Sequence, residues 1–373
     1  MRLMLVHYFN LKAAPFNYAA MAAIANRSQV YVQVSALDAG QLTLPERLFV
    51  TDADPTRRIT VPSLSFLIQH PSPPASPDNP DTTTKLIFDL GIKRDLTGYT
   101  TAQQEHIAQR MPVIATPDCT ESLRTGAHQD SIGSGERTLL EPANDIDMVI
   151  LSHVHWDHVG TPSDFPNSIF FVGAGTLDLL QNGAGPLYPA DLFNDDELPT
   201  SRTVEFPPVT TAGESGYYDG PNVPTYTPSP PGTIAKQPAA ADKWQWEPLS
   251  GFPNALDFFG DGSMYIIDSP GHLYGHVNLL ARVSKHKYVY LGGDCCHDPR
   301  ILSGEKGIAM YEDGRGGLRS VHVDTGIARR SLATIGQFIQ EKSDGREVEV
   351  EVIVAHDKIW MERNRHRFWP GIL

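Results

Sequence analysis

The stretch SHVHWDHVG, residues 152–160, places three histidines and one aspartate within six residues and directly follows the apolar run DMVIL at 147–151. A strand that ends here would present four ligand-type side chains on the loop that follows it. Neutral imidazoles and a carboxylate suit zinc or a similar divalent cation, whereas a dry core would satisfy them poorly. We interpret four residues as metal ligands: His153, His155, Asp157 and His158.

Three further ligand candidates occur later in the chain, each after an apolar run. His272 follows a Ser-Pro-Gly turn in IIDSPGHLYGH, Asp294 ends the segment VYLGGD, and His356 lies in VIVAHD. The glycine of the first turn removes side-chain bulk and lets an imidazole approach a metal closely. A histidine-rich solvated turn at 152–160 would predict no such partners. The pattern therefore favours one metal centre assembled from four strand ends.

The apolar runs also indicate the fold class. Eight runs that end in turn residues are typical of buried strands: 63–70, 85–91, 147–153, 168–173, 263–272, 277–283, 287–294 and 350–357. Helical spacing of apolar residues is clearest around 318–341 and weaker at 99–110. Two proline-rich stretches, 71–84 and about 201–243, are expected to be loops. Strand-rich halves interleaved with helices predict an α+β fold, in which two sheets pack face to face with helices outside.

These motifs together resemble the metallo-β-lactamase superfamily, whose five landmarks occur here in order. They are the aspartate of KLIFDLG at Asp89, the block at 152–160, and the turns at His272, Asp294 and His356. The resemblance covers roughly residues 60–360 and implies a four-layer αβ/βα sandwich. It implies one domain over 1–373, with an N-terminal extension at 1–55 and an insertion at about 201–243. An aspartate rather than a cysteine at 294 is most similar to the lactonase-like branch, which opens cyclic esters such as acyl-homoserine lactones.

Carried over to this chain, the resemblance assigns the ligands to two metals. One metal is bound by His153, His155 and His272, and the other by Asp157, His158 and His356. Asp294 bridges them, and Asp89 orients a ligand or the backbone of the block. Two divalent cations are expected, with zinc first and manganese, iron or cobalt also accepted by such ligands. A hydroxide shared by the two metals would attack the substrate carbonyl, and Asp157 is the candidate for passing a proton to the leaving atom.

The segment GGDCCHD departs from the pattern of the lactonases. They often carry a tyrosine three residues after the bridging aspartate, and His297 stands there in this chain. His297 could donate a hydrogen bond to the substrate carbonyl, or it could be an ordinary polar loop residue. Cys295 and Cys296 are expected to be small packing residues, because the metals already supply the nucleophile. His276 is expected to be structural.

The long interval between His158 and His272 contains the proline-rich insertion and several aromatic residues: Tyr217, Tyr218, Tyr226, Trp244 and Trp246. An aromatic lid over the metals would favour a small apolar or aromatic substrate. The alternative is an excursion that packs on the outer surface or builds a homodimer contact. The sequence leaves both open.

Composition narrows the partners and the compartment. A formal net charge of −14 repels phosphate backbones and anionic membrane surfaces, so neither nucleic acid nor a membrane is expected as a partner. The three cysteines, Cys119, Cys295 and Cys296, do not form a disulfide framework. The absence of a signal-peptide pattern and of an apolar run long enough to span a membrane predicts a cytoplasmic protein.

The leading functional hypothesis is a dinuclear metallohydrolase that opens a small lactone or lactam. A thioesterase of the glyoxalase-II-like or polyketide-releasing type uses much the same ligands, although the acidic balance argues against a basic surface for coenzyme A. From another class, an iron-dependent redox member of the superfamily is the alternative. A binding protein with a decayed site is disfavoured, because decay normally removes ligands and none is missing.

Overall fold

The computed structural model describes residues 29–71, 83–126, 139–209, 224–226, 238, 240–344 and 348–373. The first of two six-stranded sheets has the order β1-β2-β3-β4-β5-β6. Its strands are β1 (Gln33–Pro45), β2 (Arg58–Pro71), β3 (Thr83–Phe88), β4 (Met148–Ile150), β5 (Ile169–Val172) and β6 (Thr203–Glu205). The first three strands pair antiparallel, and β3 to β6 run parallel.

The second sheet has the order β14-β11-β10-β9-β8-β7. Its strands are β7 (Glu247–Leu249), β8 (Phe252–Asp257), β9 (Met264–Asp268), β10 (Val277–Ser284), β11 (Lys287–Leu291) and β14 (Glu349–Ile353). All neighbours pair antiparallel except β14, which is parallel to β11. A separate hairpin joins β12 (Tyr311–Glu312) to β13 (Leu318–Arg319).

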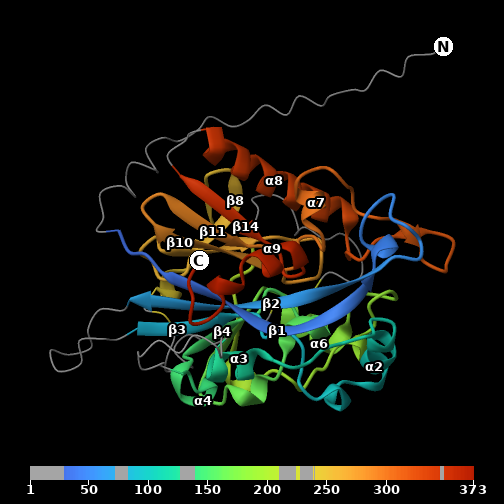
Figure 1. The fold of residues 1–373 in the computed structure, drawn as a ribbon, viewed down its shortest axis with the longest axis horizontal. Helices are drawn as coiled ribbons and strands as arrows, with labels where there is room; N and C mark the ends of the chain where they lie inside the picture. The colour runs from blue at the N-terminus through green and yellow to red at the C-terminus, as the bar shows by residue number, and fades with distance from the viewer. Residues whose placement is uncertain are drawn as a thin grey trace, which may run out of the picture.

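Helices cover the outer faces of both sheets, which gives the expected α+β sandwich of four layers (Figure 1). The first sheet is covered by α2 (Thr101–Ala108), α3 (Cys119–Thr125), α4 (Pro142–Asp145) and α6 (Thr176–Asn182), and the second by α7 (Pro299–Leu302) and α8 (Thr325–Asp344). Two short helices follow strands, α5 (Trp156–Val159) and α9 (Lys358–Arg363). A core cluster that draws side chains from both sheets, including Phe66, Phe88, Ile266 and Leu279, fills the space between them.

Each of the eight apolar runs coincides with a strand, but the bounds of the expected N-terminal extension, insertion and helix differ from the structure. Residues 33–45, placed in the N-terminal extension, instead form β1, because they pair along most of β2 and complete the first sheet. Residues 203–205, placed in the insertion, form β6 at its opposite edge. The helix expected over 318–341 begins only at Thr325, because the Asp324 side chain accepts from the Ile327 amide and caps that end.

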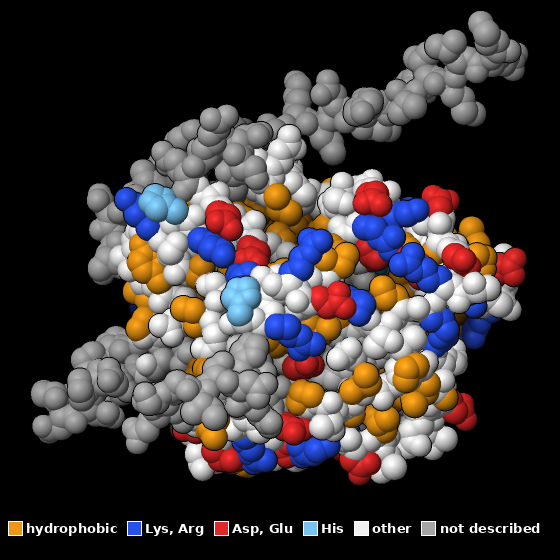
Figure 2. Space-filling model, viewed as in Figure 1, with side chains coloured by type: hydrophobic (Ala, Val, Ile, Leu, Met, Phe, Trp, Pro, Cys, Tyr) orange, Lys and Arg blue, Asp and Glu red, His pale blue; other side chains and the backbone are white. Residues whose placement is uncertain are grey.

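The surface visible in Figure 2 intersperses Lys and Arg with Asp and Glu over the described residues. In the part of the chain that the structure describes, none of the helices combines the length and apolar character that crossing a membrane requires.

Candidate metal centre

The residues that the sequence marks as ligands all lie at ends of central strands. The block at 152–160 follows β4, and its last part forms α5, which carries Asp157 and His158. His272 lies between β9 and β10, and Asp294 and His356 follow β11 and β14. Because these strands end at one edge of the two packed sheets, the structure brings all seven expected side chains together.

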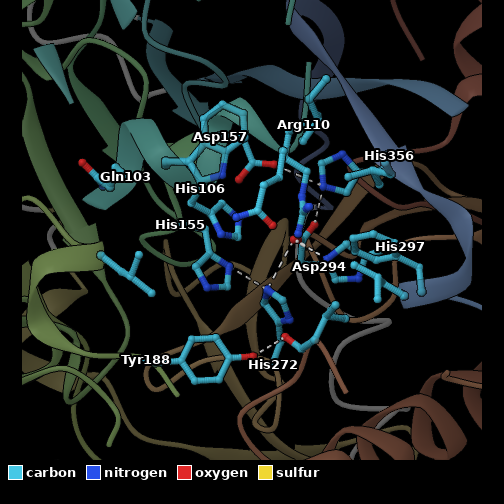
Figure 3. Close-up of a pocket in the computed structure, with 18 of the residues that line it drawn as sticks. Gln103, His106, Arg110, His155, Asp157, Tyr188, His272, Asp294, His297 and His356 are labelled. Atoms are coloured by element: carbon cyan, nitrogen blue, oxygen red, sulfur yellow. Dashed lines mark hydrogen bonds and ion pairs between the residues drawn. The ribbon is translucent and has the colours of Figure 1, made fainter. Parts of the chain in front are cut away.

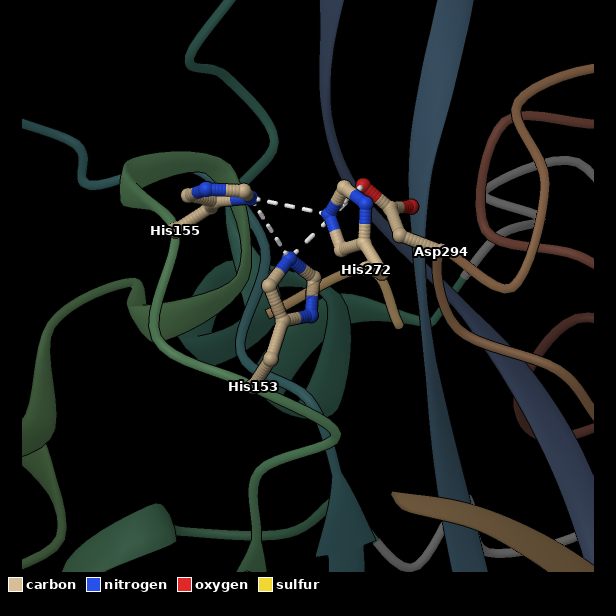
Figure 4. A group of neighbouring side chains, drawn as sticks. All are labelled: His153, His155, His272 and Asp294. Atoms are coloured by element: carbon tan, nitrogen blue, oxygen red, sulfur yellow. Dashed lines mark hydrogen bonds and ion pairs between the residues drawn. The ribbon is translucent and has the colours of Figure 1, made fainter. Parts of the chain in front are cut away.

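Four donor groups, from His153, His155, His272 and Asp294, converge in the first set (Figure 4). Nδ1 of His155 lies 3.0 Å from Nε2 of His153 and 3.0 Å from Nε2 of His272. Oδ2 of Asp294 lies 3.3 Å from Nε2 of His272 and 3.7 Å from Nε2 of His153. A tetrahedral zinc ion with bonds of about 2.0 Å would separate its ligand atoms by about 3.3 Å, so this set has the dimensions of a metal site.

The second set shares Asp294 with the first. Oδ1 of Asp294 lies 3.3 Å from Nε2 of His158 and 3.1 Å from Nε2 of His356, and Nε2 of His356 lies 3.6 Å from Oδ2 of Asp157. One carboxylate therefore presents a different oxygen to each set. This is the position that a bridging ligand between two cations would occupy.

Two buried atoms of the second set test whether a cation fits there. Among the described residues, Nε2 of His158 and Oδ1 of Asp294 are buried without a hydrogen-bond partner, although they lie 3.3 Å apart. Buried polar atoms are normally satisfied, and orphaned atoms call for an unmodelled water or ion. The residues thus fit a divalent cation in this set.

Burial keeps several of the imidazoles neutral, which is the form that binds metals. It lowers the pKa of His155 to about 3 and holds the pKa values of His153 and His272 well below the ordinary value. Burial alone would raise the pKa of Asp294, but His297, His356 and His158 outweigh it and hold that pKa well below the usual range. The first set therefore offers lone pairs on nitrogen beside one ionised carboxylate. In the second set burial acts in the same direction, but the Asp294 carboxylate outweighs it and raises the pKa values of His158 and His356.

Four of the candidate ligand histidines face the centre with Nε2, and in each of them the other ring nitrogen, Nδ1, has a partner of its own. Nδ1 of His153 contacts Ser152 Oγ at 3.0 Å, and that of His356 contacts the Pro62 carbonyl at 2.7 Å. The other two pairs are His158 with Asp89, at 2.9 Å, and His272 with His322, at 3.1 Å. Such partners fix the ring orientation and raise ligand basicity.

Asp89 holds the backbone of the block as well as a ring. Its carboxylate accepts from the Ser152 amide at 2.6 Å and from Ser152 Oγ at 2.7 Å. Its backbone has a φ of 61°, a left-handed conformation that aspartate tolerates better than most residues. These contacts are those of the supporting residue that the sequence analysis expected.

Three residues at the site escaped the sequence analysis: His322, His106 and Arg110. His322 lies in the loop between β13 and α8, and its ring is buried at the centre. His106 belongs to α2, Arg110 follows that helix, and both line the cavity described below. None of them follows an apolar strand, so no local pattern marked them.

His297 lies at the centre rather than on an exposed loop. Its Nε2 is 3.0 Å from Oδ2 of Asp294, and its ring packs 4.8 Å from that of Phe49. His276 is buried, contacts the Ser269 carbonyl through Nδ1 at 2.9 Å, and accepts from the Asp294 amide through Nε2 at 3.2 Å. The cysteines that follow Asp294 are buried and free, as expected of packing residues.

Two turns bring their backbones close enough to seat the ligands. Gly293 has a φ of 46°, and a Cβ there would lie 2.9 Å from Cβ of Ser152 and 3.1 Å from Nε2 of His276. Gly271 has a φ of 123°, and a Cβ there would lie 2.3 Å from the Ala328 amide nitrogen. Glycine is therefore required at both positions.

A cavity of about 280 Å³ opens onto the two donor sets (Figure 3). Its walls are largely apolar and aromatic: Leu42, Leu44, Leu48, Phe49, Trp156, Leu187, Tyr188, Leu192, Phe193 and Val321. Its polar lining outside the donor sets includes Gln103, His106, Gln109, Arg110, Tyr311 and Arg319. The cavity suits a compact ligand with a few polar groups.

The aromatic residues that the sequence offered for a lid lie elsewhere or outside the described residues. Trp244 packs 5.6 Å from Phe171 and 5.2 Å from Phe258 in the core between the sheets. Trp246 donates to the Pro207 carbonyl at 2.7 Å, and neither tryptophan nor Tyr226 lines the cavity. Tyr217 and Tyr218 fall outside the described residues. The aromatic wall comes instead from Phe49, Tyr188 and Phe193.

Comparison with known proteins gives moderate sequence similarity to three curated proteins. Cytochrome P450 monooxygenase mpaDE of Penicillium brevicompactum is 28% identical over 73% of this chain and 26% of its own length. Metallo-hydrolase mfmC of Annulohypoxylon moriforme is 28% identical over 73% of this chain and 58% of its own length. Gamma-lactamase FDB1 of Fusarium pseudograminearum is 29% identical over 63% of this chain and 45% of its own length. The chain spans only 26% to 33% of the length of the first curated relatives that it matches.

Solved structures share the fold at low sequence identity. An N-acyl homoserine lactone hydrolase with N-hexanoyl-L-homoserine at its catalytic metal centre matches with a TM-score of 0.54 and 13% identity, over 92% of this chain and 100% of that one. A quorum-quenching N-acyl homoserine lactone lactonase matches with a TM-score of 0.53 and 14% identity, over 92% and 99%. No family model matches the chain.

Proposed function

We propose that this chain is a metal-dependent hydrolase of the metallo-β-lactamase superfamily and that it opens a small cyclic ester or cyclic amide. The observation that carries this proposal is the pair of donor sets that share Asp294 beside a small, largely apolar cavity. A substrate carbonyl in that cavity would lie next to both sets.

The names of the relatives support a hydrolase, and two of them support a cyclic amide. FDB1 and MBL2 of Gibberella moniliformis, which are 29% and 27% identical to this chain, are both named gamma-lactamases. The homoserine lactone hydrolases share only the fold, at 13% to 14% identity, so they do not indicate the substrate of this chain. A γ-lactam or the corresponding lactone is therefore the substrate class that we propose.

We propose that the two donor sets hold two divalent cations. His153, His155 and His272 would hold one, Asp157, His158 and His356 the other, and Asp294 would contact both. Zinc is the first candidate, because imidazoles and carboxylates suit it and the donor spacing has its dimensions. When bound, such cations supply a water-derived nucleophile at neutral pH and polarise the carbonyl under attack.

Asp157 is the residue that we propose for proton transfer to the leaving atom. Its carboxylate lines the cavity and lies 3.6 Å from Nε2 of His356. Its backbone carbonyl accepts from the Ser63 hydroxyl, which ties α5 to β2 and limits movement of the side chain. Ring opening needs a proton on the leaving oxygen or nitrogen, and a positioned carboxyl group can deliver it.

His297 is proposed to orient the substrate carbonyl. Its Nε2 lies on the cavity side of Asp294, at 3.0 Å from Oδ2, and its ring is held against Phe49. An N–H at this place can donate to a carbonyl oxygen, which is one of the two roles that the sequence left open for His297. The surrounding leucines and Phe193 would exclude water from the reacting groups.

The proposal is tested by elemental analysis of the purified chain together with turnover on a small panel. The panel holds an aryl-fused γ-lactam, the matching γ-lactone, N-hexanoyl homoserine lactone and an acyl coenzyme A thioester. We expect close to two metals per chain and chelator-sensitive opening of the lactam or aryl lactone. Metal-loaded protein that acts only on the thioester, or on no member, would contradict the proposal. An Arg329→Gln variant, changed at an exposed position of α8 outside the cavity, is the control.

A further inference from the structure

Arg110 is a buried cation that faces the cavity without an ion-pair partner. It follows α2, and its side chain lines the cavity wall (Figure 3). Only 8% of the residue is exposed. Among the described residues, no carboxylate lies within ion-pair distance of its guanidinium, and no hydrogen bond from its side chain is found.

A buried guanidinium without a partner is costly, so its surroundings matter. Burial lowers the pKa of Arg110, and the carboxylate of Asp157 partly offsets that effect from a distance. The Phe49 ring lies 5.9 Å from its Cζ and supplies a weak cation–π contact. Neither replaces the paired hydrogen bonds that buried charges normally make. The side chain lines the cavity, so a ligand there could supply the hydrogen-bond acceptors that the guanidinium needs.

The two other arginines near this wall are already engaged. Arg319 lies over the Tyr188 ring at 5.0 Å and donates from Nε to the Ser320 carbonyl at 3.3 Å. Arg58 is exposed and donates to the carbonyls of Gln109 at 2.9 Å and Met111 at 3.1 Å. Arg319 also lines the cavity, but Arg110 differs from both in being buried and, within the described part of the chain, in making no side-chain hydrogen bond or ion pair.

We propose that Arg110 binds a carboxylate that the substrate carries away from the bond that is cleaved. The planar guanidinium matches a carboxylate through two parallel hydrogen bonds. Apart from the donor sets, the lining that the structure describes contains two charged residues, Arg110 and Arg319, and no carboxylate. The inference rests on the proposed function in taking this cavity as the substrate site. It narrows the substrate to a compact lactam or lactone with an acidic group.

Binding of 2-naphthoate and its uncharged counterpart 2-naphthamide to the full-length, metal-loaded chain tests this directly. Isothermal titration calorimetry would give the ratio of the two dissociation constants for each variant. Any contribution of the metals to naphthoate binding is present in every variant, so the change in the ratio reports Arg110. We expect Arg110→Gln to lower the preference for naphthoate by about tenfold to a hundredfold, the range for charge-assisted hydrogen bonds.

Two further variants make the outcome decisive. Arg110→Lys keeps the charge but loses the planar fork, and should retain only part of the preference. Arg329→Gln removes an exposed charge of the same sign on α8, outside the cavity, and should leave the ratio unchanged. An unchanged ratio in Arg110→Gln would overturn the inference. So would a fall of several degrees in the melting temperature of Arg110→Gln together with an unaltered preference in Arg110→Lys, since that combination describes a structural residue.

Kinetics with the aryl-fused γ-lactone 2-coumaranone and its 5-carboxylate separate this inference from the proposed function. We expect Arg110→Gln to raise KM for the carboxylate at least tenfold more than KM for the neutral lactone. Equal loss of kcat on both lactones would mean that Arg110 acts on the reacting carbonyl, and would overturn the inference. No turnover of any cyclic substrate, with the naphthoate preference still dependent on Arg110, would refute the proposed function alone.

Discussion

Nδ1 of His322 lies 3.1 Å from Nδ1 of His272, so two buried imidazoles meet through the same type of ring nitrogen. One nitrogen must donate and the other accept. Nε2 of His272 faces His155 and Asp294, where a lone pair is needed to hold a cation. Nδ1 of His272 therefore carries the proton, and His322 accepts it. A residue from a distant loop thus sets the tautomer of a candidate ligand.

Replacing His322 by phenylalanine keeps a ring in the space but removes the acceptor. We expect metal affinity to fall by about tenfold to a hundredfold, the usual effect of losing a partner of a metal-ligating histidine. Competition with a chromogenic chelator would measure it. His322→Asn, which can still present an acceptor oxygen, is the matched control and should lose less. Equal affinity in the wild-type chain and the phenylalanine variant would show that His322 does not support His272.

Asp294 and Asp157 should separate metal binding from proton transfer. Asp294→Asn removes the carboxylate shared by both donor sets, and we expect metal content to fall toward zero. Asp157→Asn leaves the first set intact and should retain at least one metal, while turnover falls by about a hundredfold or more. Elemental analysis and steady-state kinetics on the same preparations would check both. Full turnover in Asp157→Asn would remove its proposed role.

Removal of the metals should destabilise the chain. In the described part of the chain, Nε2 of His158 and Oδ1 of Asp294 are buried without hydrogen-bond partners. A ligand that binds only the folded state there stabilises it by mass action. Metal-free protein should gain about 3 kcal/mol in free energy of unfolding when the free zinc concentration is about a hundred times the dissociation constant of the zinc–protein complex. Differential scanning calorimetry with and without zinc would measure the change in melting temperature. Identical melting curves would argue against a metal at this site.

His106 predicts a pH-dependent loss of stability. Burial, with Arg110 and Arg319 nearby, lowers its pKa from 6.5 to about 4. The unfolded chain takes up a proton below pH 6.5, whereas the folded chain does so only near pH 4. Stability is therefore fully present above pH 6.5 and falls as the pH drops toward 4. Lowering the pH from 7.5 to 5 should therefore reduce the free energy of unfolding by about 1–2 kcal/mol through His106. The His106→Gln variant should lack this part of the pH dependence.

The measurement for His106 is urea unfolding of the wild-type and His106→Gln chains at both pH values, in the presence of a chelator. Because the other histidines titrate in both chains, the difference between the two chains isolates His106. A difference that does not change with pH would show that its pKa is not lowered by folding.

Gly293 should tolerate no side chain. A Cβ there would lie within 2.9 Å of Ser152 Cβ, and the left-handed φ of 46° adds strain. Gly293→Ala would push the turn away from the block at 152–160. We expect lower stability by about 1–3 kcal/mol and a loss of metal. Gly304→Ala is the control, because it combines a φ of 75° with open space around its Cβ. If both variants behaved alike, the backbone angle rather than the close approach would be responsible.

Much of the fold and the donor sets could be predicted from local patterns. Each apolar run that forms a central strand is a continuous segment, and ligands such as Asp294 and His356 directly follow one. The weaker predictions concerned segments without such a pattern. Residues 33–45 gave no clear strand signal, because their place in the sheet depends on pairing with β2. Trp244 looked like a lid residue, but Phe171, Phe206 and Phe258 draw it into the core.

The sequence by itself determined the ligand types, their spacing and their positions at strand ends, because these follow from covalent order and from the burial of apolar runs. Only the tertiary structure decided which loops meet. His322 reaches His272 across 50 residues of chain, and Arg110 reaches the cavity from beyond α2. Such contacts depend on the packing of sheets and loops. The convergence of the candidate ligands could therefore be predicted from the sequence, whereas the partner of His272 and the place of Arg110 in the cavity wall could not.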